Sequence, residues 1–102
     1  MQYLIQTQDG PGVNWQKHND LLSEESLCLH ELWKKGIVRQ MWLTEQNQSV
    51  LLFECGNRIE VQSIMESLPL VKQRLITYVI TKLVMYSPFD RIIATPVSAS
   101  KA

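Results

Sequence analysis

The sequence predicts an α+β fold in which four strands form one antiparallel sheet and two helices cover one of its faces. Short runs rich in β-branched and aromatic residues alternate with two stretches whose apolar residues recur at helical spacing. Turn and capping signals separate these runs. A length of 102 residues suits a single domain built on one core.

The N-terminal part reads as a strand followed by a helix. Residues 2–8 carry β-forming side chains and end at an Asp-Gly-Pro-Gly turn at residues 9–12. After a polar stretch, Ser23 has the position of an N-cap. Glu24 and Glu25 would then lie in the first helical turn, where the helix dipole favours acidic groups.

This first helix is expected to end at Gly36, which has the position of a C′ residue. Its apolar stripe consists of Leu29, Leu32 and Trp33. Strands at residues 37–44 and 49–55 follow, joined by the polar loop 45–48. The two strands therefore form a hairpin.

The second helix begins with the capping-box pair Asn57 and Glu60 and is stopped by Pro69. Its apolar residues are Val61, Ile64, Met65 and Leu68. Residues 75–84 form a fourth strand with apolar side chains on both faces, as expected for an interior strand.

This β-α-β-β-α-β order is that of the ferredoxin-like fold, with both helices on one face of the sheet. We expect a single domain over residues 1–95 and a flexible tail over residues 96–102. The other sheet face is left open, and an apolar open face is usually covered by a second copy of the chain.

The second strand carries two polar residues, Arg39 and Gln40, that must point to opposite faces. A hairpin loop centred between residues 46 and 47 pairs Arg39 with Glu54 across the strands, which predicts an ion pair there. Arg39 could instead bind a substrate. Gln40, beside Trp42, has no such partner and could bind a small ligand, a partner subunit or water.

Composition excludes several classes of function. Ten basic and ten acidic residues cancel, so a nucleic-acid surface is not expected. No apolar run approaches the roughly 20 residues of a membrane span, and the N-terminus lacks an export signal. Cys28 and Cys55 lack metal-ligand spacing and read as free thiols in the cytoplasm. We expect neither a metal nor another cofactor.

Three segments resemble the muconolactone isomerase-like branch of the dimeric α+β barrel superfamily. They are GIVRQMWL at 36–43, SVLLFE at 49–54 and SLPLVKQRLITYVITKLVMYSPF at 67–89. The Leu-Pro-Leu step at 68–70 and the tryptophan of the second strand are the most specific elements. The resemblance implies a homodimer, or a higher oligomer, in which two open sheet faces pack into a barrel with pockets beside the sheet.

The resemblance also implies a chemistry. Muconolactone isomerases move a proton along a small unsaturated lactone acid without metal or cofactor, which requires an acid–base group and a cation for the substrate carboxylate. Glu25 matches the glutamate of their first helix, Arg39 an arginine and Trp42 a tryptophan of their second strand. Thr77 and Val79 stand where the isomerases have acidic residues.

Two functions are therefore predicted. The first is a cofactor-independent enzyme on a small lactone, enol or organic acid, with Glu25 or His30 transferring the proton and Arg39, Gln40 and Trp42 holding the substrate. The second is a non-catalytic dimer that binds a small organic molecule or assists a pathway enzyme. In the second case Glu25 is only a first-turn helix acid and His30 a surface histidine.

Overall fold

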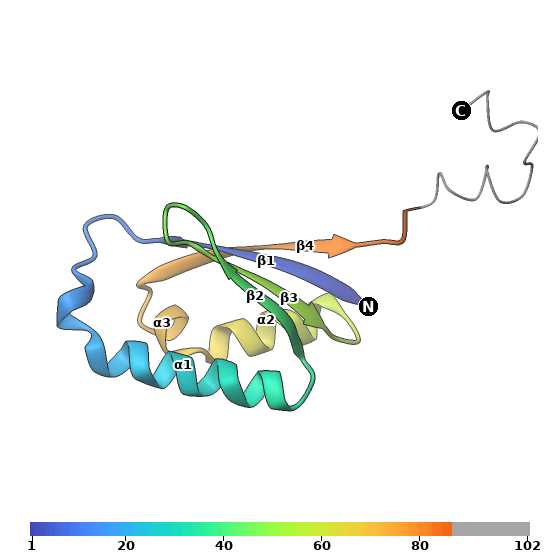
Figure 1. The fold of residues 1–102 in the computed structure, drawn as a ribbon, viewed down its shortest axis with the longest axis horizontal. Helices are drawn as coiled ribbons and strands as arrows, with labels where there is room; N and C mark the ends of the chain where they lie inside the picture. The colour runs from blue at the N-terminus through green and yellow to red at the C-terminus, as the bar shows by residue number, and fades with distance from the viewer. Residues whose placement is uncertain (87–102) are drawn as a thin grey trace, which may run out of the picture.

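A four-stranded antiparallel sheet with strand order β2-β3-β1-β4 forms the centre of the chain (Figure 1). The computed structural model describes residues 1–86, so the tail predicted at 96–102 and the end of the predicted domain lie outside the described residues. The strands are β1 (Gln2–Asp9), β2 (Val38–Leu43), β3 (Ser49–Glu54) and β4 (Ile76–Leu83). The helices are the short 3-10 helix η1 (Trp15–Lys17), α1 (Asn19–Lys34), α2 (Arg58–Ser67) and α3 (Pro69–Lys72). The predicted ferredoxin-like fold is confirmed.

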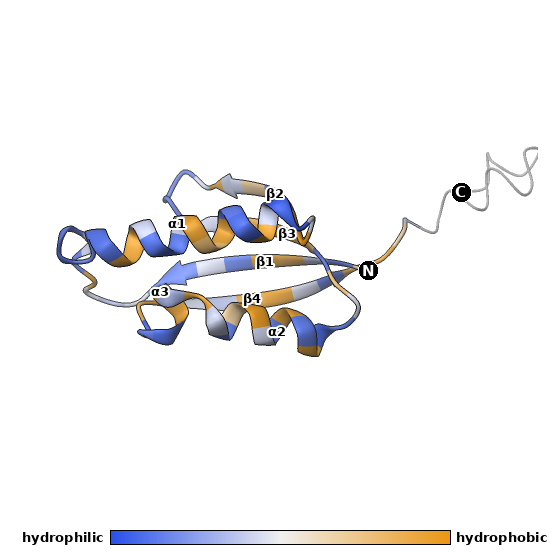
Figure 2. Ribbon diagram, turned by 90° about the horizontal axis from the view of Figure 1, so that it is seen from below, coloured by the Kyte–Doolittle hydropathy of each residue, from blue (hydrophilic) through white to orange (hydrophobic). Residues whose placement is uncertain are grey.

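All three α-helices lie on the same face of the sheet (Figure 1). Seen from that side, α1 lies toward β2, and α2 lies over β4 (Figure 2). The core fills the space between the layers. Its largest fully buried side chains are Tyr3, Phe53, Ile5, Met65, Leu68, Val38 and Val61. Alternate residues of β1 point into this core, as the twofold repeat of a strand requires.

Helix α1 begins four residues before the predicted N-cap at Ser23, with His18 as the observed N-cap. The polar stretch ahead of it is structured, because η1 leads directly into the helix and the His18 carbonyl already accepts from the Leu22 N–H at 2.9 Å. Glu25 therefore lies well inside α1, so its predicted place in the first turn is wrong. Asp20 is the acidic residue of that turn.

The predicted end of α1 is confirmed at Gly36, which has a φ of +76°. The Gly36 N–H donates to the Trp33 carbonyl and the Ile37 N–H to the Leu32 carbonyl, both at 3.0 Å. These are the two bonds of a Schellman motif, whose left-handed residue is favoured to be glycine.

The N-cap of α2 is confirmed as well. Asn57 Oδ1 accepts from the Glu60 N–H at 2.8 Å, while Glu60 Oε2 accepts from the Gly56 N–H at 3.0 Å instead of from Asn57. Pro69 ends α2 as predicted and also occupies the first turn of α3, where a missing N–H costs nothing.

The register of the β2–β3 hairpin differs from the prediction. The closing pair of the hairpin is Leu43 with Ser49, so five residues join the strands instead of the predicted four, and Gln40 pairs with Leu52. A further register shift between Val38 and Gln40 leaves Arg39 at an irregularity of the strand. The predicted Arg39–Glu54 ion pair is wrong. Glu54 Oε2 instead accepts from the N-terminal ammonium of Met1 at 2.5 Å, which is the main reason that the pKa of Glu54 is lowered.

Strand β4 lies at one edge of the sheet, so its predicted interior position is wrong. Within residues 1–86 it pairs with β1 alone, and Val79 on its open face is 62% exposed. An interior position in the sheet therefore does not explain why β4 has apolar residues on both faces. These residues instead indicate that the sheet face opposite the helices is also covered.

Candidate functional site

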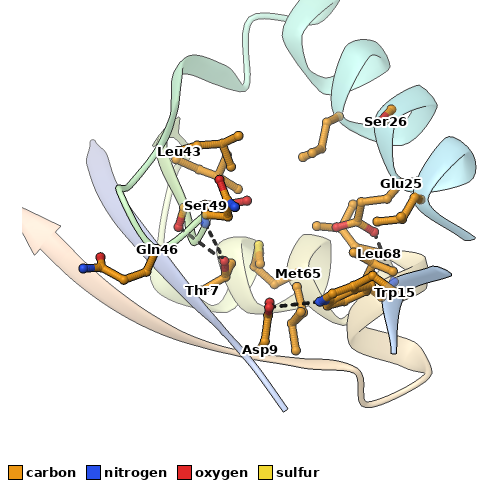
Figure 3. Close-up of a pocket in the computed structure, with 16 residues that line it drawn as sticks. Thr7, Asp9, Trp15, Glu25, Ser26, Leu43, Gln46, Ser49, Met65 and Leu68 are labelled. Carbon is orange, nitrogen blue, oxygen red and sulfur yellow. Dashed lines mark hydrogen bonds between the residues drawn. The ribbon is translucent and has the colours of Figure 1, made fainter. Parts of the chain in front are cut away.

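A cavity of about 500 Å³ lies between α1 and the helix-facing side of the sheet (Figure 3). Much of its wall is apolar and comes from Leu22, Leu29, Leu43, Leu51, Met65, Leu68, Leu70 and Ile76. The polar lining residues are Thr7, Asp9, Glu25, Ser26, Gln46, Asn47 and Ser49, and Trp15 adds an indole ring. An apolar pocket of this size with a few polar groups is the usual form of a small-molecule site.

Glu25 is the buried carboxyl group of this cavity, with only 8% of its surface exposed. Its Oε1 accepts from the Leu70 N–H at 3.1 Å (Figure 3). Leu70 lies in the first turn of α3, where backbone N–H groups have no partner within the helix, so Glu25 caps that helix from across the core. Within residues 1–86, Oε2 has no hydrogen-bond partner, and since no fully buried side-chain oxygen there is unpaired, Oε2 is accessible.

Burial raises the pKa of Glu25 above its usual value of 4.5, because a charged carboxylate is poorly solvated there. The hydrogen bond from the Leu70 N–H acts in the opposite direction and is the smaller effect. A carboxyl group with a raised pKa can exist in both protonation states closer to neutral pH. Glu25 thus has the burial and the free oxygen that proton transfer requires.

Asp9 supplies a second carboxyl group at the C-terminal end of β1. Its Oδ2 accepts from Trp15 Nε1 at 3.0 Å (Figure 3). Its backbone N–H donates to Gln48 Oε1 at 2.9 Å. The first bond holds the indole of η1 against the cavity. The second ties the end of β1 to the β2–β3 loop.

The sheet side of the cavity is already well bonded at Thr7. Its hydroxyl accepts from the Ser49 N–H at 3.0 Å and donates to the Ser49 carbonyl at 3.3 Å. Because both bonds satisfy this hydroxyl, Thr7 joins β1 to the start of β3 and is not a free ligand group. Ser26, Gln46 and Asn47 are the other polar residues of the lining, and the Gln46 side chain points away from Glu25 (Figure 3).

Of the five side chains predicted to form a site, Glu25 alone lines this cavity. His30 is exposed on α1, and Arg39 and Gln40 are exposed on β2. Trp42 is 48% exposed and borders a smaller hollow of about 310 Å³ between β2 and α1. The structure therefore separates residues that the sequence placed in one site.

Sequence reasoning missed Asp9 and Trp15. Asp9 read as the first residue of a turn, and Trp15 stood in a stretch taken for a polar connection. A single tryptophan within a polar segment was the one available signal, because so large an apolar ring is rarely left in water.

Other kinds of site find no support in the described part of the chain. No group of three His, Cys, Asp or Glu side chains is placed to hold a metal ion within residues 1–86. Cys55 is a buried free thiol whose pKa is raised by that burial, and Cys28 is half-buried. None of the helices in residues 1–86 is long and apolar enough to cross a membrane.

The solved structures that share this architecture include an isomerase and a dehydrochlorinase. Muconolactone isomerase, known from a crystal structure at 3.3 Å resolution, aligns with a TM-score of 0.72 and 16% identity over 85% of this chain and 92% of that chain. This chain has the muconolactone isomerase fold. The 5-chloro-2-hydroxyhydroquinone dehydrochlorinase TftG of Burkholderia phenoliruptrix AC1100, solved in complex with 2,5-dihydroxybenzoquinone, aligns with a TM-score of 0.68 and 23% identity.

The TftG alignment covers 82% of this chain and 94% of that chain, so the muconolactone isomerase fold extends over most of both proteins. No protein-family profile matches the chain, and a comparison with curated protein sequences finds no match. At these identities the likeness establishes the fold, and the chemistry has to be argued from the cavity.

Proposed function

We propose that the chain is a cofactor-independent enzyme that moves a proton within a small lactone, enol or organic acid bound in the cavity. Glu25 is the group that transfers the proton. The observation that carries this proposal is a carboxyl group that is 8% exposed, has a raised pKa and keeps one oxygen without a partner in residues 1–86. The two fold relatives, an isomerase and a dehydrochlorinase, support it.

The reaction needs a base that removes a proton from carbon next to a carbonyl and then returns it elsewhere. Oε2 of Glu25 does both, while the Leu70 N–H holds Oε1 and fixes the orientation of the carboxyl group. The apolar wall lowers the polarity around the reacting atoms, which strengthens electrostatic interactions inside the cavity. Asn47 also lines the cavity, and its side-chain amide is the donor that we assign to a developing enolate oxygen.

Three other predicted site residues, His30, Gln40 and Trp42, lie outside the cavity lining and take no part in the proposed reaction. His30 lies outside the cavity lining, so we give the proton transfer to Glu25. Gln40 and Trp42 pair with Leu52 and Val50 and share the open face of the sheet with them. We propose that this face packs against a second copy of the chain, so that both residues contact a partner subunit.

Replacing Glu25 by glutamine tests the enzymatic proposal. Solvent deuterium exchange at the acidic carbon, followed by NMR on a panel of lactones and enols, detects proton transfer without knowledge of the product. We expect Glu25→Gln to slow exchange by about 10²–10⁴-fold, which is the usual contribution of a general acid or base. Glutamine keeps an acceptor for the Leu70 N–H, so the fold should persist.

Glu24→Gln is the matched control, because it removes an exposed carboxylate from the neighbouring position of α1. Exchange should continue at the wild-type rate in this variant. Equal rates for wild type and Glu25→Gln on every substrate that exchanges would contradict the role of Glu25.

The second candidate is a dimer that binds a small molecule in the same cavity without turning it over. The observation that favours it is the hydrogen bond from the Leu70 N–H to Glu25, since capping α3 gives this glutamate a structural role that requires no chemistry. Saturable binding by the wild type with no exchange in any bound ligand would select this candidate.

A further inference from the structure

We propose that Asp9 sets the charge preference of the cavity, so that it takes uncharged rings that carry hydroxyl groups and rejects rings that carry a carboxylate. This inference rests on the proposed function, because it names the substrate class of that same cavity. It concerns binding, however, and can be tested without turnover.

Two carboxyl groups from different elements line the one cavity. Glu25 extends from α1 and Asp9 from the end of β1 (Figure 3). Neither forms an ion pair within residues 1–86, where the salt bridges are those of Met1 with Glu54 and of Lys34 with Glu31. An aspartate side chain carries a negative charge at neutral pH, so a ligand carboxylate in the cavity would meet a like charge.

Glu25 gives independent support for a ligand that donates hydrogen bonds. Its side chain is more than nine-tenths buried, and Oε2 has no protein partner in the described range. An accessible acceptor of this kind, on a side chain that is otherwise buried, is satisfied when a ligand brings a hydroxyl group to it. On Asp9, Oδ2 already accepts from Trp15, and Oδ1 has no partner among residues 1–86. Two hydroxyl groups on one ring could thus donate to two acceptors, Oε2 of Glu25 and Oδ1 of Asp9.

The placement of Arg39 points in the same direction. A ligand carboxylate in an apolar cavity requires a cationic partner, and no Lys, Arg or His is among the described residues that line this cavity. Here Arg39 is exposed at the irregular position of β2 and is not part of the cavity lining. The side chains that do line the cavity offer acceptors, amides and apolar surface instead.

A cationic amine is the other ligand that two carboxyl groups could accept. The apolar wall disfavours it, because an ammonium group loses much of its hydration in such a cavity and regains it only through well-placed ion pairs. A neutral ring loses little hydration and gains contact with Leu29, Leu51 and the Trp15 indole.

Three matched ligands separate these classes: resorcinol, 3,5-dihydroxybenzoate and 3,5-dihydroxybenzylamine. They share one dihydroxylated ring and differ in the charge of a single substituent. Affinities come from titration calorimetry, and the shift of the Trp15 indole N–H signal, assigned with Trp15→Phe, places the ligand in the cavity. We expect the wild type to bind resorcinol at least tenfold more tightly than the benzoate, and more tightly than the amine.

Asp9→Asn tests the residue itself. Asparagine keeps an oxygen that can accept from Trp15 Nε1, so the indole stays in place while the charge is removed. The preference for resorcinol over the benzoate should fall to within about threefold in this variant. Glu24→Gln, which removes one exposed charge outside the cavity, should leave the preference unchanged.

Three results would overturn the inference: a benzoate or amine that binds more tightly than resorcinol, a preference that Asp9→Asn does not alter, or the absence of resorcinol binding to the folded protein. These results do not depend on Glu25→Gln and deuterium exchange. If the protein prefers the benzoate to resorcinol, this inference fails, but proton transfer by Glu25 is not contradicted. If it prefers resorcinol but catalyses no deuterium exchange, the proposed enzyme fails and the chain is a binding protein.

Discussion

The two oxygens of Glu25 have different surroundings, and this difference makes the residue both structural and available for chemistry. Oε1 is held by the Leu70 N–H at 3.1 Å, whereas Oε2 has no partner in residues 1–86. Burial without a countercharge destabilises the ionised form, so the folded state holds the Glu25 proton at a pH where the unfolded chain has released it.

This proton gives a pH dependence of stability with a definite sign. Because the folded state binds more protons than the unfolded state above pH 4.5, the contribution of Glu25 to stability falls as the pH rises through its folded pKa. Glu25→Gln removes this dependence and keeps the acceptor for Leu70. We expect the variant to be more stable than the wild type at pH 7, measured by urea unfolding from pH 4 to 8. Parallel curves for the two proteins would disprove a raised pKa.

At the scale of the elements, α3 connects the cavity to the sheet. It follows α2 at Pro69 and provides the N–H that bonds Glu25. It ends in a Schellman motif, with the Arg74 N–H donating to the Val71 carbonyl at 2.9 Å and the Leu75 N–H to the Leu70 carbonyl at 3.0 Å. The left-handed residue of this motif is Arg74, with a φ of +58°, where glycine is usual.

Arg74→Gly should therefore stabilise the protein. The left-handed conformation costs a non-glycine residue about 1–2 kcal/mol, which glycine avoids. The greater freedom of glycine in the unfolded chain offsets about 0.5–1 kcal/mol of this stabilisation. We expect a net increase of about 0.5–1 kcal/mol in the free energy of unfolding, measured by chemical denaturation. Arg74→Ala serves as the control, since it removes the charge and keeps the strain. A glycine variant no more stable than the alanine variant would contradict this account.

At the scale of the whole molecule, the open face of the sheet remains to be explained. Helices cover one face, while Leu4, Trp42, Leu52 and Val79 lie on the other together with polar side chains. Trp42 and Val79 are 48% and 62% exposed. Exposed apolar side chains on the uncovered face of a sheet favour an interface, so the homodimer stays our prediction.

Leu52→Lys tests that prediction, because Leu52 lies on the interior strand β3 between Leu4 and Gln40. A lysine at the centre of a buried apolar interface should convert the dimer to a monomer, as measured by light scattering after size-exclusion chromatography. Gln62→Lys, on the exposed side of α2, is the matched control and should leave the oligomer unchanged. A wild type that is monomeric at all concentrations would contradict the predicted homodimer.

Local chemistry explains which features could be predicted. The spacing of Val61, Ile64 and Met65, the cap at Asn57 and the stop at Gly36 each depend on residues a few positions apart. The start of α1 was missed because η1 precedes it without a strong capping signal at His18. The β2–β3 register was missed because residues 44–48, five instead of the predicted four, join the strands, and one more loop residue changes every pair of the hairpin.

The sequence by itself determined the order of strands and helices, and with it the ferredoxin-like topology, because periodicity, caps and turns are local properties of the chain. Tertiary structure alone decided that Glu25 is buried, that Asp9 and Trp15 share its cavity, and that Arg39, Gln40 and Trp42 do not. The bond that positions Glu25 joins residues 45 positions apart. Such contacts depend on how the layers pack, which no local pattern of residues encodes.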